Sequence, residues 1–174
     1  MFDHPLYSPH AYPRAAAQVR EAVDRAREHP RVDGDRIALW FFSGGGPLCS
    51  DWLRDPPSWL RCVALTYPRL GGPDLEPSFQ PTAAVRDVGA AAAAGVAGAM
   101  RANGLPIVLT RVGLERPDIA VTVTQFVAEA RIAEANLTII DVPAGQHAFD
   151  TLDDTDASRQ AITQATDHVL AALR

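Results

Sequence analysis

A serine followed by three glycines stands directly after an apolar segment. Residues 36–42 read RIALWFF, and Ser43 precedes the glycines at 44–46. A buried strand that ends in a serine and turns at once into a helix has the geometry of a nucleophile elbow, in which the turn lifts the hydroxyl above the sheet. The segment therefore predicts Ser43 as a nucleophile, a helix that begins near Gly44, and a Gly44 amide that faces an acyl oxyanion.

Two other glycine-rich turns, and a plain structural turn, are the alternatives. The phosphate-binding pattern G-x-x-x-x-G-K needs a lysine, and this chain contains none. The dinucleotide-binding pattern needs a third glycine at the position that Cys49 occupies. These two patterns fail, so a purely structural turn remains as the alternative interpretation.

A nucleophilic serine needs a histidine and an acid, and both occur further along the chain. Glu115 and Asp118 follow the third apolar segment, and His147 follows the fourth. One class of serine hydrolases has this chain order of serine, acid and histidine, with all three residues at the carboxyl ends of successive strands. Glu115 is the favoured acid because it lies closer to the strand end. Asp118 is the alternative acid, although we expect it to cap the following helix.

Four apolar segments must carry these residues. Their apolar side chains are nearly continuous rather than alternating, which favours strands of a parallel sheet that is covered on both faces. The four predicted strands are residues 36–42, 60–67, 105–112 and 136–142.

Helical patterns separate the predicted strands. Apolar residues recur at helical spacing in three segments, 14–30, 119–135 and 162–173. The alternation of helices and strands indicates an α/β fold, a mainly parallel sheet flanked by helices. No linker divides the chain, so we expect one domain over residues 1–174.

Two further segments have open interpretations. Residues 68–82 are rich in proline and glycine and are expected to form a long loop, which either shapes a pocket or is flexible. Residues 83–100 are rich in alanine and have no marked polar face. They predict either a packed helix or a cap segment over a site.

Composition limits the partners. The chain has 174 residues, 47% hydrophobic and 21% charged, and a formal net charge of −5. No basic run is interleaved with aromatic residues, so we expect neither a nucleic-acid nor a membrane partner, but a small molecule. No signal peptide is evident and no apolar run approaches the roughly 18 residues of a membrane span, which predicts a cytoplasmic protein. Cys49 and Cys62 have no metal-binding or redox spacing, and we expect both to be reduced.

Three segments together resemble a known family. Residues 32–46 (VDGDRIALWFFSGGG), 109–118 (LTRVGLERPD) and 144–150 (AGQHAFD) are similar to the dienelactone hydrolase-like branch of the α/β-hydrolase superfamily. The resemblance covers the chain from about Phe2 to its end and corresponds to the carboxyl-terminal part of that domain. It implies that Ser43 is the nucleophile, that His147 is the general base and then acid, and that Glu115 orients the histidine. It also implies an ester or lactone substrate.

The bulky residue two positions before the serine departs from the family pattern. The G-x-S-x-G motif has a small residue where this chain has Phe41, because that position is crowded in the elbow. A ring there needs an opened turn or a void. It would either narrow the acyl pocket or mark an elbow that is no longer under catalytic demand.

A second departure concerns the start of the sequence. A full hydrolase has further strands there, and a loop after one of them donates a second oxyanion amide. Residues 2–24 resemble the end of an early strand, a loop and the helix that leads to the elbow strand, so we expect a partial fold that lacks the amino-terminal strands. The elbow strand would then be an apolar edge. Either the sequence is a fragment, or the protein is a homo-oligomer through this exposed sheet edge.

These patterns lead to one expected function and one alternative. We expect a serine hydrolase that cleaves a carboxylic ester or lactone through an acyl-enzyme, with no cofactor. The alternative is a catalytically degenerate α/β-hydrolase fold that serves as a binding or assembly module and keeps its cleft for a small ligand.

Overall fold

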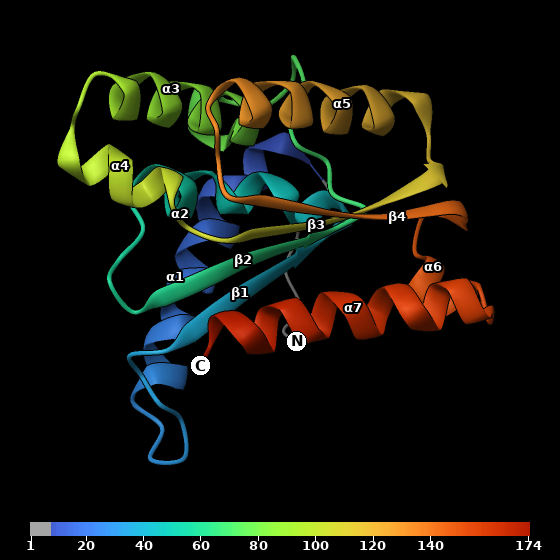
Figure 1. Ribbon diagram of the computed structural model, residues 1–174, viewed down its shortest axis with the longest axis horizontal. Coiled ribbons are helices and arrows are strands. Elements are labelled where there is room, and N and C mark those ends of the chain that lie inside the picture. The colour runs from blue at the N-terminus through green and yellow to red at the C-terminus, as the bar shows by residue number, and fades with distance from the viewer. Residues whose placement is uncertain (1–7) are drawn as a thin grey trace.

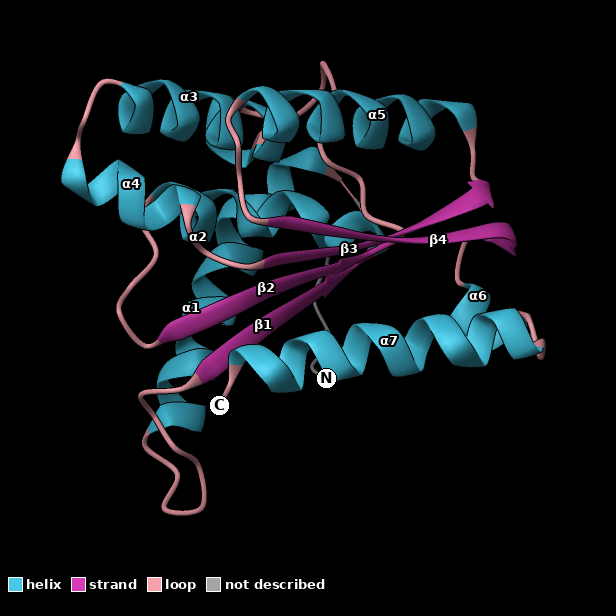
Figure 2. Ribbon diagram, in the orientation of Figure 1, coloured by secondary structure: helices cyan, strands magenta, loops and turns pink. Residues whose placement is uncertain are grey.

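A four-stranded parallel sheet forms the centre of the molecule (Figures 1 and 2). The computed structural model describes residues 8–174, so the early strand end expected near residue 2 lies outside the described part. The strands follow one another across the sheet in chain order. They are β1 (Ile37–Phe42), β2 (Leu60–Thr66), β3 (Ile107–Leu114) and β4 (Leu137–Gln146). All four predicted strands are confirmed.

The last two strands extend further toward their carboxyl ends than the sequence predicted. The end of β3 stays paired with β4 as far as Leu114 and Gln146, although these ends are exposed and contain glycine and proline. The register shifts between Val112 and Leu114, where the two backbones approach closely. A β-carbon at Gly113 would lie 2.0 Å from the carbonyl oxygen of Pro143, so only glycine fits there.

The helices form a layer on each face of the sheet, with α3 and α5 on one side of it and α7 on the other (Figure 1). One core packs α1, α2, α3 and α5 against side chains such as Leu65 and Leu109, and a second core packs α6 and α7 against Ala64, Val108 and Ile140. The helices are α1 (Tyr12–Arg27), α2 (Ser50–Arg54), α3 (Pro81–Ala93), α4 (Ala97–Asn103), α5 (Pro117–Ile132), α6 (Phe149–Leu152) and α7 (Asp156–Ala172). The sheet is therefore covered on both faces, as its apolar strands require.

The alanine-rich segment forms two helices. Gly95, with a φ of +82°, lies between α3 and α4. A β-carbon at Gly89 in α3 would lie 2.3 Å from the β-carbon of Ala133, just after α5, so the two helices pack at close range. The interpretation of this segment as a packed helix holds for α3.

The proline-rich loop is packed and hydrogen-bonded. Leu70, Leu75 and Phe79 are buried in the core beneath it. The Gln80 amide donates to the carbonyl oxygens of Gly72 and Leu75, and Arg54 of α2 donates to the carbonyl oxygens of Pro77 and Ser78. These contacts hold the loop against the helical layer.

Strand β1 is the edge of the sheet in the described residues, since it pairs only with β2 (Figure 2). A groove of about 470 Å³ runs along this edge between β1 and α1, and its walls are mostly apolar. Phe41 lines the groove and is buried among α1 and β1 side chains. The ring thus has the space that the sequence indicated it would need. No helix within residues 8–174 is long and apolar enough to cross a membrane.

Candidate active site

Ser43 lies on a sharp turn at the carboxyl end of β1. Its φ of +50° is in the left-handed region, which residues other than glycine seldom adopt. The turn packs tightly against the segment that follows β2, because a β-carbon at Gly46 would lie 2.2 Å from the carbonyl oxygen of Arg69. Such a strained turn between a strand and a helix holds a serine hydroxyl above the sheet edge.

The helix predicted after Ser43 begins as a 3₁₀-helix. Residues Ser43–Cys49 form a 3₁₀-helix, and the α-helix α2 starts only at Ser50. The three glycines disfavour an α-helix, and Pro47 lacks the amide hydrogen that an α-helix needs. The helix expected near Gly44 is therefore present, but its first part is a 3₁₀-helix and the α-helix follows from Ser50.

Three side chains from separate strand ends form one chain of hydrogen bonds. Ser43 Oγ lies 2.7 Å from Nε2 of His147, and Nδ1 of the same ring lies 2.7 Å from Oε2 of Glu115. The carboxylate can only accept, so Nδ1 carries the proton and Nε2 is free to accept from the serine hydroxyl. This arrangement allows the ring to take a proton from Ser43 while the carboxylate stabilises the imidazolium.

Glu115 lies in the short link between β3 and α5. Its side chain is only 4% exposed, and its second oxygen, Oε1, accepts from the backbone amide of Arg116 at 2.8 Å. Both oxygens therefore accept a hydrogen bond, which fixes the carboxylate beside the ring. Because β3 stays paired with β4 up to Leu114 and Gln146, Glu115 lies beside the end of β4.

Asp118, the alternative acid, has a different partner. It is the second residue of α5, and its carboxylate accepts from the guanidinium of Arg116, which lowers its pKa. The expectation that it caps this helix is wrong, since Arg116 occupies the N-cap position and no side chain caps the helix. Asp118 still favours the helix by placing a negative charge in the first turn.

His147 follows β4 directly and is held by its neighbours. Ala148 adopts a left-handed φ of +62°, which turns the chain into α6. Asp153 accepts from the backbone amide and the side-chain amide of Gln146, just before the histidine. Gly145 belongs to β4, and the turn is formed by His147 and Ala148.

Hydrogen bonds hold the peptide groups before and after Gly44. The Ser43 carbonyl oxygen accepts from the amide of Arg69 at 3.0 Å, which fixes the peptide plane that contains the Gly44 amide. The Tyr12 hydroxyl donates to the Gly44 carbonyl oxygen at 2.8 Å. The Gly44 amide is thus a donor whose orientation is set before any ligand binds, as oxyanion stabilisation requires.

Sequence reasoning missed Tyr12, Arg69 and Tyr67. The ring of Tyr67 lies 4.8 Å from the ring of His147, centroid to centroid. No sequence signal could have singled out these residues, because their contacts with the site span long separations in the chain.

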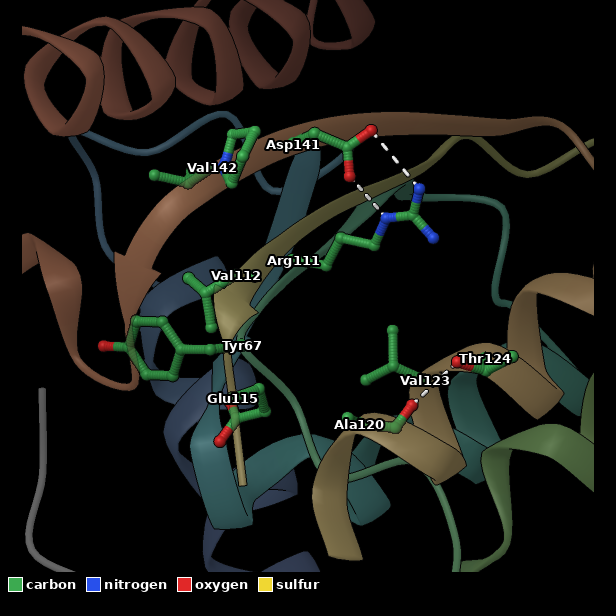
Figure 3. Close-up of a pocket in the computed structure, with 11 residues that line it drawn as sticks. Tyr67, Arg111, Val112, Glu115, Ala120, Val123, Thr124, Asp141 and Val142 are labelled. Atoms are coloured by element: carbon green, nitrogen blue, oxygen red, sulfur yellow. Dashed lines mark hydrogen bonds and ion pairs between the residues drawn. The ribbon is translucent and has the colours of Figure 1, made fainter. Parts of the chain in front are cut away.

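A cavity of about 420 Å³ lies beside the acid (Figure 3). Glu115 and Tyr67 lie toward one end of it, and an ion pair between Arg111 of β3 and Asp141 of β4 lies toward the other. Residues of α5 form the remaining wall. Within residues 8–174, no group of three or more His, Cys, Asp or Glu side chains is placed to hold a metal ion.

Solved structures share this fold, whereas no family model and no curated protein matches the sequence. A proposed dienelactone hydrolase from Klebsiella pneumoniae matches with a TM-score of 0.65 at 17% identity, over 93% of this chain and 61% of that protein. Apo esterase 2 of Thermogutta terrifontis matches with a TM-score of 0.65 at 16% identity, over 90% of this chain and 64% of the esterase. The chain thus spans less than two thirds of the length of either protein.

Proposed function

We propose that this chain, which has part of the α/β-hydrolase fold, is a serine hydrolase of carboxylic esters or lactones. The observation that carries the proposal is the unbroken hydrogen-bond chain from Ser43 through His147 to Glu115. A serine with a left-handed backbone conformation at a strand end, an imidazole and a buried carboxylate supply a nucleophile, a base and an orienting group.

The reaction begins with attack of Ser43 Oγ on the carbonyl carbon of the substrate. His147 Nε2 takes the hydroxyl proton, and Glu115 stabilises the imidazolium that forms. The carbonyl oxygen becomes an oxyanion that accepts from the Gly44 amide. When the intermediate collapses, the bond to the alcohol oxygen breaks and His147 returns the proton to that oxygen. An acyl ester on Ser43 remains.

Water completes the cycle. His147 removes a proton from a water molecule, and the resulting hydroxide attacks the acyl carbonyl. The second intermediate expels Ser43 Oγ, which takes its proton back from His147. The products are a carboxylic acid and an alcohol, joined in one molecule when the substrate is a lactone.

The fold relatives support the choice of probes. Structures of Thermogutta terrifontis esterase 2 have been solved with butyrate bound and with the enzyme phosphorylated by paraoxon. A short acyl ester and an organophosphorus compound are accordingly the first substrate and inhibitor to test on this chain.

Hydrolysis of p-nitrophenyl butyrate tests the proposal. We expect the protein to release p-nitrophenol, and we expect Ser43→Ala to reduce the rate by at least about a thousandfold. Ser58→Ala is the matched control, because Ser58 is an exposed serine outside the site, and we expect it to retain the rate. Equal rates for the Ser43 and Ser58 variants would contradict the proposal. No hydrolysis by a folded wild-type protein that binds the ester would favour the alternative of a binding module.

A further inference from the structure

Tyr67 stands at the centre of a set of contacts that the reaction above does not use. It is the residue directly after β2, and it is only 6% exposed. Its φ of +37° lies in the left-handed region, where a bulky residue is unusual and strained. Its backbone amide still donates to the carbonyl oxygen of Thr110 at 2.8 Å, so Tyr67 remains attached to the sheet.

The side chain of Tyr67 contacts both ends of the histidine turn, by which we mean residues 147–150. The ring lies 4.8 Å from the His147 ring and 5.8 Å from the Phe149 ring, with the latter pair edge-to-face. The hydroxyl donates to Oδ1 of Asp150 at 2.7 Å. One side chain therefore joins the end of β2 to the three residues around Ala148, the turn's left-handed residue.

The hydrogen bond is suited to a permanent structural link. Burial, together with the hydrogen bond to Asp150, raises the pKa of the Tyr67 hydroxyl. The hydroxyl therefore stays protonated and remains a donor throughout the neutral range. A hydrogen bond to a charged acceptor is stronger than one between neutral groups, so the Asp150 carboxylate holds Tyr67 firmly.

We propose that Tyr67 is a positioning residue that holds the His147 ring between Ser43 and Glu115, by its ring contact and by its hydrogen bond to Asp150. The proposal rests on the proposed function for its kinetic meaning, but the placement of the ring is independent of activity. His147 is 29% exposed, and its two hydrogen bonds alone leave it free to tilt about the line between them. The Tyr67 ring, whose centroid lies 4.8 Å from that of the imidazole, restricts this tilt.

The first measurement follows the reaction. Tyr67→Phe keeps the ring and removes the hydroxyl, and we expect it to lower the rate of Ser43 modification by a fluorophosphonate about tenfold. The same variant should lower kcat for p-nitrophenyl butyrate with little change in KM, because it acts on the base rather than on substrate binding.

Two variants of the acceptor test the link itself. Asp150→Ala should reproduce the effect of Tyr67→Phe, whereas Asp150→Asn keeps an oxygen that accepts from the tyrosine and should restore most of the rate. In the double variant Tyr67→Phe/Asp150→Ala, the loss should be no larger than in either single variant, because both remove the same bond.

The second measurement does not depend on activity. The proton on Nδ1 of His147 is hydrogen-bonded to Glu115 and can be observed by NMR, with His147→Gln identifying its signal. We expect this proton to exchange with water several-fold faster in Tyr67→Phe than in the wild type, because the ring is held less firmly.

Thr66→Val is the matched control. Thr66 precedes Tyr67 in the chain, and its hydroxyl accepts a hydrogen bond from the indole of Trp40. The substitution removes this bond, which does not involve the histidine turn. Rates and proton exchange that are the same in Tyr67→Phe as in Thr66→Val would overturn the proposal. If no fluorophosphonate modifies the wild-type protein but the proton still exchanges faster in Tyr67→Phe than in the wild type, the positioning role is upheld and the proposed function is contradicted.

Discussion

At the scale of single residues, the identity of the acid is open to a direct test. Glu115→Gln keeps the size of the side chain but presents an amide that can no longer stabilise the imidazolium. We expect the rate of ester hydrolysis to fall by about 10³-fold or more. Asp118→Asn should change the rate less than about twofold, since its carboxylate pairs with Arg116. The opposite outcome would make Asp118 the acid.

The two cysteines give a second prediction at this scale. Both are free, as the sequence predicted, and both are buried. Burial raises the pKa of the Cys62 thiol to about 11, from an ordinary value of 9.0, and also raises the pKa of Cys49. We therefore expect neither thiol to react with a disulfide reagent in the folded protein at pH 8, and both to react in guanidinium.

The same shift sets a pH dependence of stability. The folded pKa of Cys62 lies above the unfolded value, so its neutral thiol stabilises the fold fully below about pH 9. This contribution is lost as the pH rises toward about 11. The free energy of unfolding of Cys62→Ala should fall less steeply over that range than that of the wild type. Equal slopes would contradict the assignment.

At the scale of elements, the turn after β1 depends on one glycine more than on the others. A β-carbon at position 46 would lie 2.2 Å from a backbone oxygen, whereas one at position 45 meets nothing within 4 Å. Gly46→Ala should lower the free energy of unfolding by about 1–3 kcal/mol and slow Ser43 modification, because the turn must open. Gly45→Ala is the control, and equal loss in both variants would show that the close approach is unimportant.

The strands were predictable because a parallel sheet buries both faces and so leaves continuous apolar segments in the sequence. The carboxyl-terminal extensions of β3 and β4 could not be predicted, since their exposed ends contain glycine and proline. These ends are strands because β3 and β4 pair with each other there. The meeting of Ser43, Glu115 and His147 followed from chain order and strand ends. Tyr12 and Tyr67 make hydrogen bonds to residues 32 and 83 positions away in the chain, which no local pattern reveals.

At the scale of the whole molecule, the predicted α/β-hydrolase fold is confirmed by solved structures that extend beyond the part this chain matches. In the described residues, β1 is an apolar edge beside the groove of about 470 Å³. Unpaired strand edges of this kind associate with other chains. We therefore propose that the protein self-associates through β1 and α1.

A charge at the rim of the groove tests this association. Ala26 lies on the exposed side of α1 and lines the groove. We expect Ala26→Glu to shift the protein toward the monomer in sedimentation velocity, because a carboxylate there would have to be desolvated in the interface. Ala90→Glu, at an exposed alanine of α3, should leave the distribution unchanged. A wild-type protein that is monomeric at high concentration would contradict self-association.

The most direct test of the central claim is the site of modification by a fluorophosphonate, measured by intact mass and peptide mapping. Only a serine activated by a neighbouring base reacts readily with such a probe. The account predicts one added phosphonyl group on Ser43, and modification slowed by at least about a hundredfold in His147→Ala. A folded wild-type protein that stays unmodified, or that is modified at another serine, would contradict it.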